Sequence, residues 1–175
     1  MKKLFALTLV LLLVAGCGST TVKLGMGVVT GISASAATAE ADGKIQANVS
    51  VVSAAFDANG KVLNAAIDAV QPKGTFDATG ALKFDPAGEV KTKNELGDDY
   101  GMRKVSAIGK EVNEQYAALA SYMVGKNAKD IIAMPTYKRD DNHTAVPDVE
   151  ELKTTCTITV GELLKAFEKA YNTAK

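Results

Sequence analysis

The stretch KIQANVSVVSAAF, residues 44–56, decides the fold because apolar and polar side chains alternate along it. In its first half the apolar residues share one face and the polar residues the other: Ile45, Ala47, Val49 and Val51 against Gln46, Asn48 and Ser50. A period of two is typical of a β-strand. Residues 57–60, DANG, break the pattern, and residues 61–70 resume it with Val62 and Ile67. The pair predicts an antiparallel hairpin in which Asn59-Gly60 supplies the left-handed conformations of a tight turn.

The motif Phe-Asp-x-x-Gly occurs three times, at residues 56–60, 76–80 and 84–88. An Asp at the first turn position can accept hydrogen bonds from the turn amides, Gly suits the last position, and the preceding Phe can anchor the strand end in the core. Asp57 with Asn59 also matches the start of a calcium loop. The later carboxylate ligands of such a loop are missing, so the repeat favours turns over metal binding.

The segments on either side complete the predicted architecture. Residues 22–32 are rich in Val, Thr and Gly and predict a strand that is bent or bulged at Gly25, Gly27 or Gly31. Apolar residues recur at helical spacing from Val105 to Met123, which predicts a helix centred on residues 110–124 with Gly125 as its C-terminal cap.

Two further helices are predicted near the end of the chain. Residues 127–134 read as a short helix stopped by Pro135. A capping box at Thr159 and Glu162 predicts a last helix over residues 160–172, which would bury Leu163, Leu164, Phe167 and Tyr171. Strands followed by helices indicate an α+β fold, a mainly antiparallel sheet built from hairpins with helices on one face, in a single domain over residues 22–175.

Composition excludes several classes of function. Lys+Arg and Asp+Glu are equal at 20 each and the isoelectric point is near 6.6, so the chain lacks the positive charge of a general nucleic-acid binder. Two cysteines leave no room for a disulfide scaffold or a four-thiolate zinc site, and one His limits imidazole chemistry. Hydrophobic residues, at 47%, are sufficient for a packed core.

The first residues match a secretory targeting signal. Lys2 and Lys3 precede an apolar run over residues 4–14, which is too short to span a bilayer and suits the core of a secretory signal. The run ends in LVAGC, residues 13–17, which resembles the lipobox of bacterial lipoproteins. That resemblance implies cleavage of residues 1–16 and a lipid on Cys17, with residues 17–21 as anchor and tether. We therefore expect a slightly acidic, lipid-anchored protein on the extracytoplasmic face of the cell membrane.

The densest polar and aromatic cluster is ELGDDYGMRK, residues 95–104. Such a loop can line a ligand pocket, with Tyr100 stacking on the ligand and Arg103 or Lys104 holding an anion; Asp98 and Asp99 complete the tentative site. The alternative is a loop that leads into the following helix, in which the Asp residues favour the positive helix end and Tyr100 packs as a lid.

Two other groups deserve a chemical interpretation. His143 follows Asp140 and Asp141 in a polar stretch between two prolines and could furnish part of a metal site, although a solvated charged loop explains the same residues. Cys156 alternates with Thr, which favours a small buried side chain on a short strand over a redox centre. No catalytic triad can be assembled around any Ser.

The chain resembles an uncharacterised family of small lipoproteins from Firmicutes. The resemblance covers most of residues 22–174 and runs through five segments: GMGVVT (25–30), FDANGK (56–61), ELGDDYGM (95–102), IGKE (108–111) and TITV (157–160). A more distant likeness is to FMN-binding lipoprotein domains, whose flavin is attached to a Thr that closes an Asp-x-x-Ser/Thr-Gly-Ala-Thr motif. Here DATGAL, residues 77–82, is one residue shorter and ends in Leu82.

Three functions are compatible with these residues. The first is a noncatalytic module that binds a small ligand or a membrane-proximal protein partner and needs no cofactor. The second, implied by the distant likeness, is an electron-transfer domain with a noncovalently bound flavin. The third is a metal-assisted enzyme that uses the His143 loop.

Overall fold

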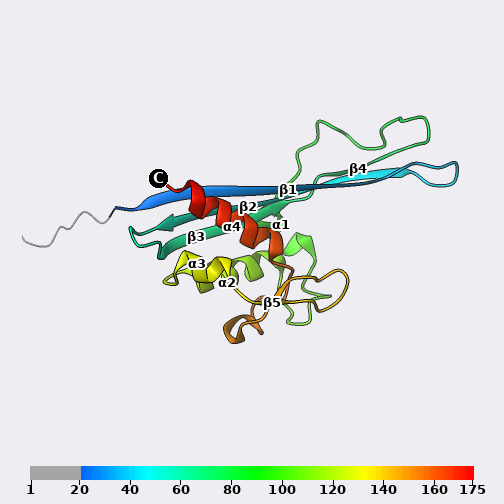
Figure 1. Cartoon of the computed structure of the whole chain (residues 1–175). Helices are drawn as coiled ribbons and strands as arrows, with labels where there is room; N and C mark the ends of the chain where they lie inside the picture. Colours follow the sequence, from blue (N-terminus) through cyan, green and yellow to red (C-terminus); the bar gives the residue numbers. More distant parts are fainter. Residues whose placement is uncertain (1–20) are drawn as a thin grey trace, which may run out of the picture.

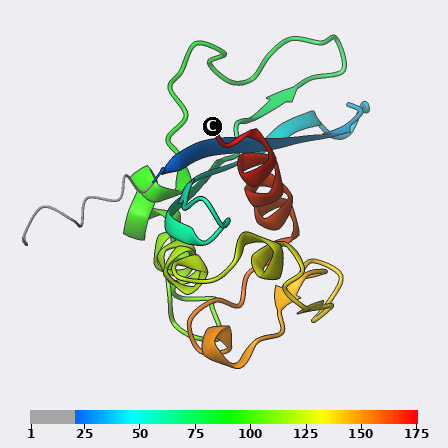
Figure 2. The same ribbon diagram turned by 60° about the vertical axis from the view of Figure 1, so that its left-hand side comes forward.

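The computed structural model describes residues 21–175, which form one α+β domain with an antiparallel sheet and helices on one of its faces (Figures 1 and 2). The predicted fold class is confirmed. The leader and Cys17 lie outside the described residues. Between residues 21 and 175, no helix is long and apolar enough to cross a membrane.

The sheet is built on a long central strand. β2 (Gly43–Phe56) pairs along most of its length with β1 (Lys23–Ser35), and on its other side with β3 (Val62–Val70) and then β4 (Lys73–Phe76). All these pairings are antiparallel. The predicted hairpin is therefore confirmed as β2 and β3. The far ends of β1 and β2 extend beyond the helices as an arm (Figure 1).

The turn between β2 and β3 shows the predicted Asp chemistry. The Asp57 carboxylate accepts hydrogen bonds from the amides of Asn59 and Lys61, at 2.8 and 2.9 Å. Gly60 alone takes a positive φ, of 80°, and the strands are offset by a bulge at Ala55/Phe56. Asn59 was expected to share the left-handed conformation and does not, because a bulged turn of this type needs only one such residue.

The other two copies of the motif also form turns, but only the first Phe is fully buried. Asp77 accepts from the amides of Thr79 and Ala81, and Asp85 from that of Ala87. Phe56 belongs to the core, whereas Phe84 is exposed. The Asp supplies the turn chemistry in all three copies; the anchoring function of Phe holds only where helices cover the strand.

The helical elements follow the sheet in the chain. They are α1 (Lys93–Leu96), α2 (Val112–Met123), α3 (Ala128–Ile132) and α4 (Gly161–Thr173), with 3-10 turns at Gly97–Tyr100 and Glu150–Leu152 and a small hairpin of β5 (Thr136–Tyr137) and β6 (Val146–Pro147). α3 begins at the cap residue Asn127 and ends before Pro135, as predicted. Gly125, with φ 84°, follows α2 as predicted.

The core lies between the sheet and α2, α3 and α4. Its largest fully buried apolar side chains include Phe56 from β2, Leu119 and Met123 from α2, Ile131 from α3 and Phe167 from α4. The rings of Phe56 and Phe167 meet edge to face with centroids 5.8 Å apart. Aromatic pairs in this geometry add to the free energy gained by burial. The hairpin and the last helix are thus joined through one aromatic cluster.

β1 is straight where a bend was predicted. It runs for 13 residues in continuous register with β2, and no bulge interrupts it. A Cβ atom on Gly25 would overlap the Ala170 carbonyl oxygen, and one on Gly27 would overlap that of Ala166. The glycines therefore admit the backbone of α4 against the strand rather than bending it.

Two helix boundaries differ from the predictions. α2 starts at Val112, whereas Val105 lies in a loop with 85% of its surface exposed. The apolar spacing therefore predicted a helix that begins too early. The Thr159–Glu162 capping box does not form: the Thr159 hydroxyl donates to the Asn142 carbonyl, at 3.4 Å, and α4 is capped by no side chain of the described residues. Capping boxes form instead at Thr92/Glu95 and Glu111/Glu114.

Candidate functional site

The loop that the sequence singled out is held together by its own charges. Arg103 pairs with Asp98 at 2.8 Å and with Glu114 at 3.0 Å. The buried Glu111 carboxylate accepts the amides of Met102 and Arg103, at 2.8 and 2.7 Å. These contacts fix the path of the chain into α2, which matches the structural alternative for the loop.

The remaining residues of that loop are not brought together as a pocket. The Tyr100 ring is partly buried, and the Lys93 ammonium lies over it in a cation–π contact, 5.1 Å from the ring centroid. Asp99 and Lys104 are exposed. The two cavities described below are lined by other residues. Ligand binding by Asp98, Asp99, Tyr100, Arg103 and Lys104 stays a prediction.

His143 is engaged by a single carboxylate. Its Nδ1 lies 2.7 and 2.8 Å from the two oxygens of Asp140, and Arg139 also pairs with that residue. The hydrogen bond from His143, followed by those from Arg139 and the Asn142 amide, lowers the pKa of Asp140 to about 2. Within residues 21–175 no three His, Cys, Asp or Glu side chains gather in a way that could hold a metal ion.

The segment that resembles the flavin attachment motif forms a closed turn. The Asp77 carboxylate accepts from the Thr79 hydroxyl at 2.7 Å as well as from two backbone amides, and these bonds lower the pKa of Asp77. All its hydrogen bonds serve the turn itself. Flavin binding therefore gains no support from this segment and stays a hypothesis.

Cys156 is a buried free thiol, as predicted, although it follows the turn Glu150–Leu152 rather than lying on a strand. Burial raises the pKa of Cys156 to about 12. A thiol in this state is a poor nucleophile.

A cavity that the sequence did not indicate, with several polar side chains in its lining, lies between the arm of the sheet and the start of α4. Its volume is about 570 Å³, within the range of small-molecule sites. The polar side chains that line it come from five separate parts of the chain: Asn48 and Ser50, Gln71, Lys93, Thr144, and Thr159, Glu162 and Lys165.

Side-chain amides fix one wall of this cavity. The Asn48 Oδ1 atom accepts from Nε2 of Gln46 and from Nε2 of Gln71, both at 2.7 Å. An amide side chain carries an NH₂ group that donates and a carbonyl oxygen that accepts. These bonds use the Asn48 oxygen and the Gln71 nitrogen, so the Asn48 NH₂ group can donate to a ligand and the Gln71 carbonyl can accept from it. The alternation in the sequence predicted only that Gln46, Asn48 and Ser50 share the polar face of a strand; in the structure this face is the helix side of β2.

The opposite wall is the start of α4. The first backbone amides of a helix have no partner within the helix, and here no side chain of the described residues caps them. Glu162 lies in the first turn, and its carboxylate accepts a hydrogen bond from the hydroxyl of the buried Ser50, at 3.4 Å. The helix dipole and the charge of Lys165 favour negative charge in this cavity, whereas Glu162 opposes it; Lys93 also lines the cavity, with its ammonium over the Tyr100 ring.

Comparison with known proteins identified no matching family model, no curated relative and no similar solved structure.

Proposed function

We propose that the chain is a noncatalytic binding module, held on the extracytoplasmic face of the cell membrane by a lipid on Cys17, and that it takes a small polar ligand into the cavity between β2 and α4. The cavity is the observation that carries the proposal. It combines a volume suited to a small molecule with a wall of fixed amides and several converging charges.

The charges define the class of ligand. An anionic group of the ligand can face Lys165 and the uncapped amides of α4. A bare anion meets repulsion from Glu162, so a ligand that also carries a positive or hydrogen-bond-donating group is favoured. Free amino acids and short peptides have this combination of groups.

Binding can be tested with the protein extracted from bacterial membranes in detergent. Individual amino acids, acetate and inorganic phosphate are titrated by calorimetry and by the shift in melting temperature. We expect at least one zwitterion to bind, with affinity reduced tenfold or more by Lys165→Ala and by Asn48→Ala. Lys129→Ala removes an exposed charge from α3 and serves as the control. Binding unaffected by either cavity variant would place the ligand elsewhere.

The anchor is tested separately. Labelled fatty acid should enter the wild-type protein but not Cys17→Ala. Equal labelling of both would refute the lipoprotein assignment and leave the ligand experiment intact.

A further inference from the structure

One face of the sheet is left uncovered by the helices and is apolar. The even-numbered residues of β1 point away from α4, and Leu24, Met26 and Ile32 are exposed over 66%, 63% and 74% of their surface. The paired odd-numbered residues of β2, from Ile45 to Ala55, continue the same face. These are the residues that alternate most clearly in the sequence, and they lie outside the core.

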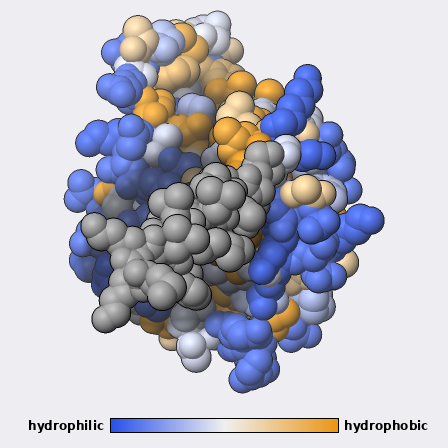
Figure 3. Space-filling model, turned by 90° about the vertical axis from the view of Figure 1, so that its left-hand side faces the viewer, coloured by the Kyte–Doolittle hydropathy of each residue, from blue (hydrophilic) through white to orange (hydrophobic). Residues whose placement is uncertain are grey.

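Exposed apolar residues of this kind also gather visibly on the surface. In Figure 3 orange residues collect on the upper side of the molecule, beside the grey atoms. Over the three long strands, the register places a single charged residue on this face, Asp68, and its carboxylate already accepts the amides of Ala69 and Asn94. Depletion of charge at the centre of a patch is typical of protein interfaces.

The face has a ridge and a hollow side by side. Leu24 and Met26 form the ridge on β1. Ser53, Ala55 and Ala66, on β2 and β3, have small side chains and line a shallow hollow of about 460 Å³ that these ridge residues border. A two-fold axis can place the ridge of one copy in the hollow of another, which is the self-complementarity that a symmetric dimer requires.

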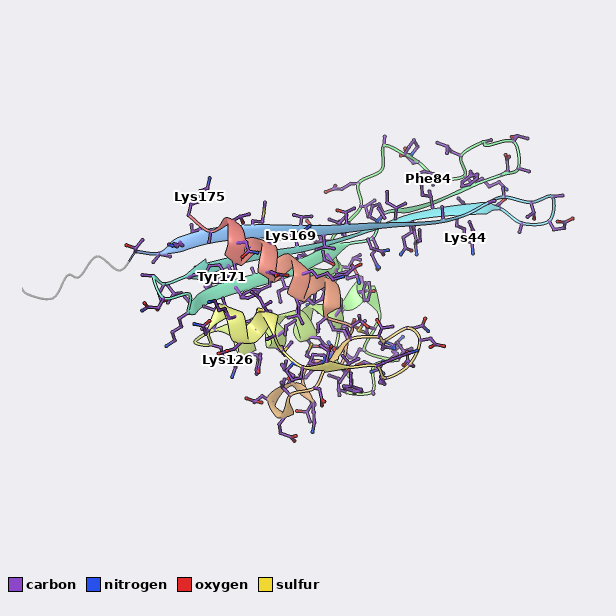
Figure 4. All side chains as sticks on the ribbon, viewed as in Figure 1. Lys44, Phe84, Lys126, Lys169, Tyr171 and Lys175 are labelled. Carbon is purple, nitrogen blue, oxygen red and sulfur yellow. The ribbon has the colours of Figure 1, made fainter. Side chains whose placement is uncertain are left out.

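The surroundings of the face favour a second copy over a flat membrane surface. The loop of residues 77–92 rises from the sheet on the side away from the helices (Figures 1 and 2), and Phe84 lies on that side against Gly74 (Figure 4). A flat bilayer lying parallel to the sheet would meet this loop before it reached the hollow near Met26. A second copy can approach beside the loop.

The outer edge of β1 is also partly closed to strand addition. Leu24 exchanges both backbone hydrogen bonds with Lys175, at 3.0 and 3.2 Å. The carbonyls of Met26 and Val28 accept from Thr173 and Lys169 of α4, at 3.3 and 2.8 Å (Figure 4). Strand addition beside Leu24, Met26 and Val28 is therefore hindered, whereas the face next to them stays accessible for association.

We propose that two copies of this chain associate face to face, with Leu24 and Met26 of each copy in the hollow lined by Ser53, Ala55 and Ala66 of the other. Three strands spaced about 4.8 Å apart and roughly 30 Å long present on the order of 450 Å² per copy. The total of about 900 Å² for the two copies lies below the usual range of stable, specific interfaces, so the dimer is weak in solution. Attachment of both copies to one membrane raises their effective concentration and strengthens it.

The mass of the detergent-extracted protein is measured by sedimentation over a range of concentrations. We expect a concentration-dependent dimer, weakened at least tenfold by Met26→Lys. Val105→Lys places the same charge on another exposed apolar residue and should leave the dimer unchanged. Circular dichroism confirms that both variants fold. A protein that is monomeric up to millimolar concentration, or a dimer that Met26→Lys does not weaken, overturns the proposal.

Cross-linking tests the arrangement directly. The double variant Met26→Cys/Ala66→Cys should form disulfide-linked dimers on mild oxidation, and neither single variant should do so efficiently. If the double variant stays uncrosslinked while dimers sediment, the face-to-face packing is wrong. If Met26→Lys instead releases a different, co-purifying protein from a monomeric chain, the face belongs to that partner and the homodimer is refuted. Neither sedimentation nor cross-linking measures ligand binding or fatty-acid labelling. A negative result in either experiment would therefore refute the dimer and leave the proposed function standing.

Discussion

The backbone of Gly27 lies directly against the carbonyl oxygen of Ala166, with no space for a Cβ atom between them. Gly25 and Ala170 repeat this contact one turn further along α4. The last helix of the chain is thereby placed on its first strand, at a distance that only glycine permits. Figure 4 shows α4 along β1, with Lys169 and Tyr171 labelled in its C-terminal half.

Gly27→Ala should therefore destabilise the fold by about 1–3 kcal/mol, the usual effect of overpacking a close contact. Urea denaturation of the folded protein measures the change. Gly31→Ala is the matched control on the same strand, because the nearest atom to its added Cβ is 3.8 Å away. Equal losses in the two variants would show that strand propensity, rather than helix contact, selects glycine here.

The three Asp-containing turns should respond differently to loss of their glycine. Gly60 and Gly80 have φ of 80° and 87°, so Ala at either position should lower stability by about 1–2 kcal/mol. Gly88 has no positive φ and has room for a Cβ, so Gly88→Ala should change little. Thermal unfolding of the three variants provides the comparison. A loss at Gly88 as large as at Gly60 would contradict this explanation.

The contact between Asp140 and His143 should make stability depend on pH at the acid end. The folded pKa of Asp140, about 2, lies below its ordinary value of 3.8. The carboxylate therefore stabilises the folded state above pH 4, and this contribution is lost as the pH falls from about 4 to about 2. Wild type should be more stable than Asp140→Asn at pH 6, and the difference should shrink toward pH 2. A difference independent of pH would show that the carboxylate charge is not its source.

The Cys156 thiol should not react in the folded protein. With its pKa raised to about 12 and its side chain buried, it has little thiolate at neutral pH and no access for a reagent. Labelling by a thiol-specific chromogenic reagent at pH 8 should require guanidinium, and Cys156→Ala supplies the background. Rapid labelling of the native protein would indicate frequent opening of the segment around Leu152.

Local patterns predicted much of the fold. The β2–β3 hairpin, the Asp turns and the Asn127 cap each depend on neighbouring residues, so short stretches of sequence suffice for them. The capping box at Thr159 does not form because α4 begins one residue later than the box requires, with Val160 at the cap position, and the Thr159 hydroxyl donates to the distant Asn142 carbonyl. The candidate cavity could not be predicted for a related reason: its amides, lysines and Glu162 meet only after five separate segments have folded together.

The sequence by itself determined the approximate positions of β1, β2, β3, α2, α3 and α4, because hydrophobic period and turn chemistry act over a few residues. It also determined that Ile45, Ala47, Val49 and Val51 share a face. Only the tertiary structure decided that the helices leave this face uncovered and that Val52, Ala54 and Phe56 form the core. The physical reason is that both faces of β2 are apolar in part, and α4 can approach only the side where Gly25 and Gly27 leave space for its backbone.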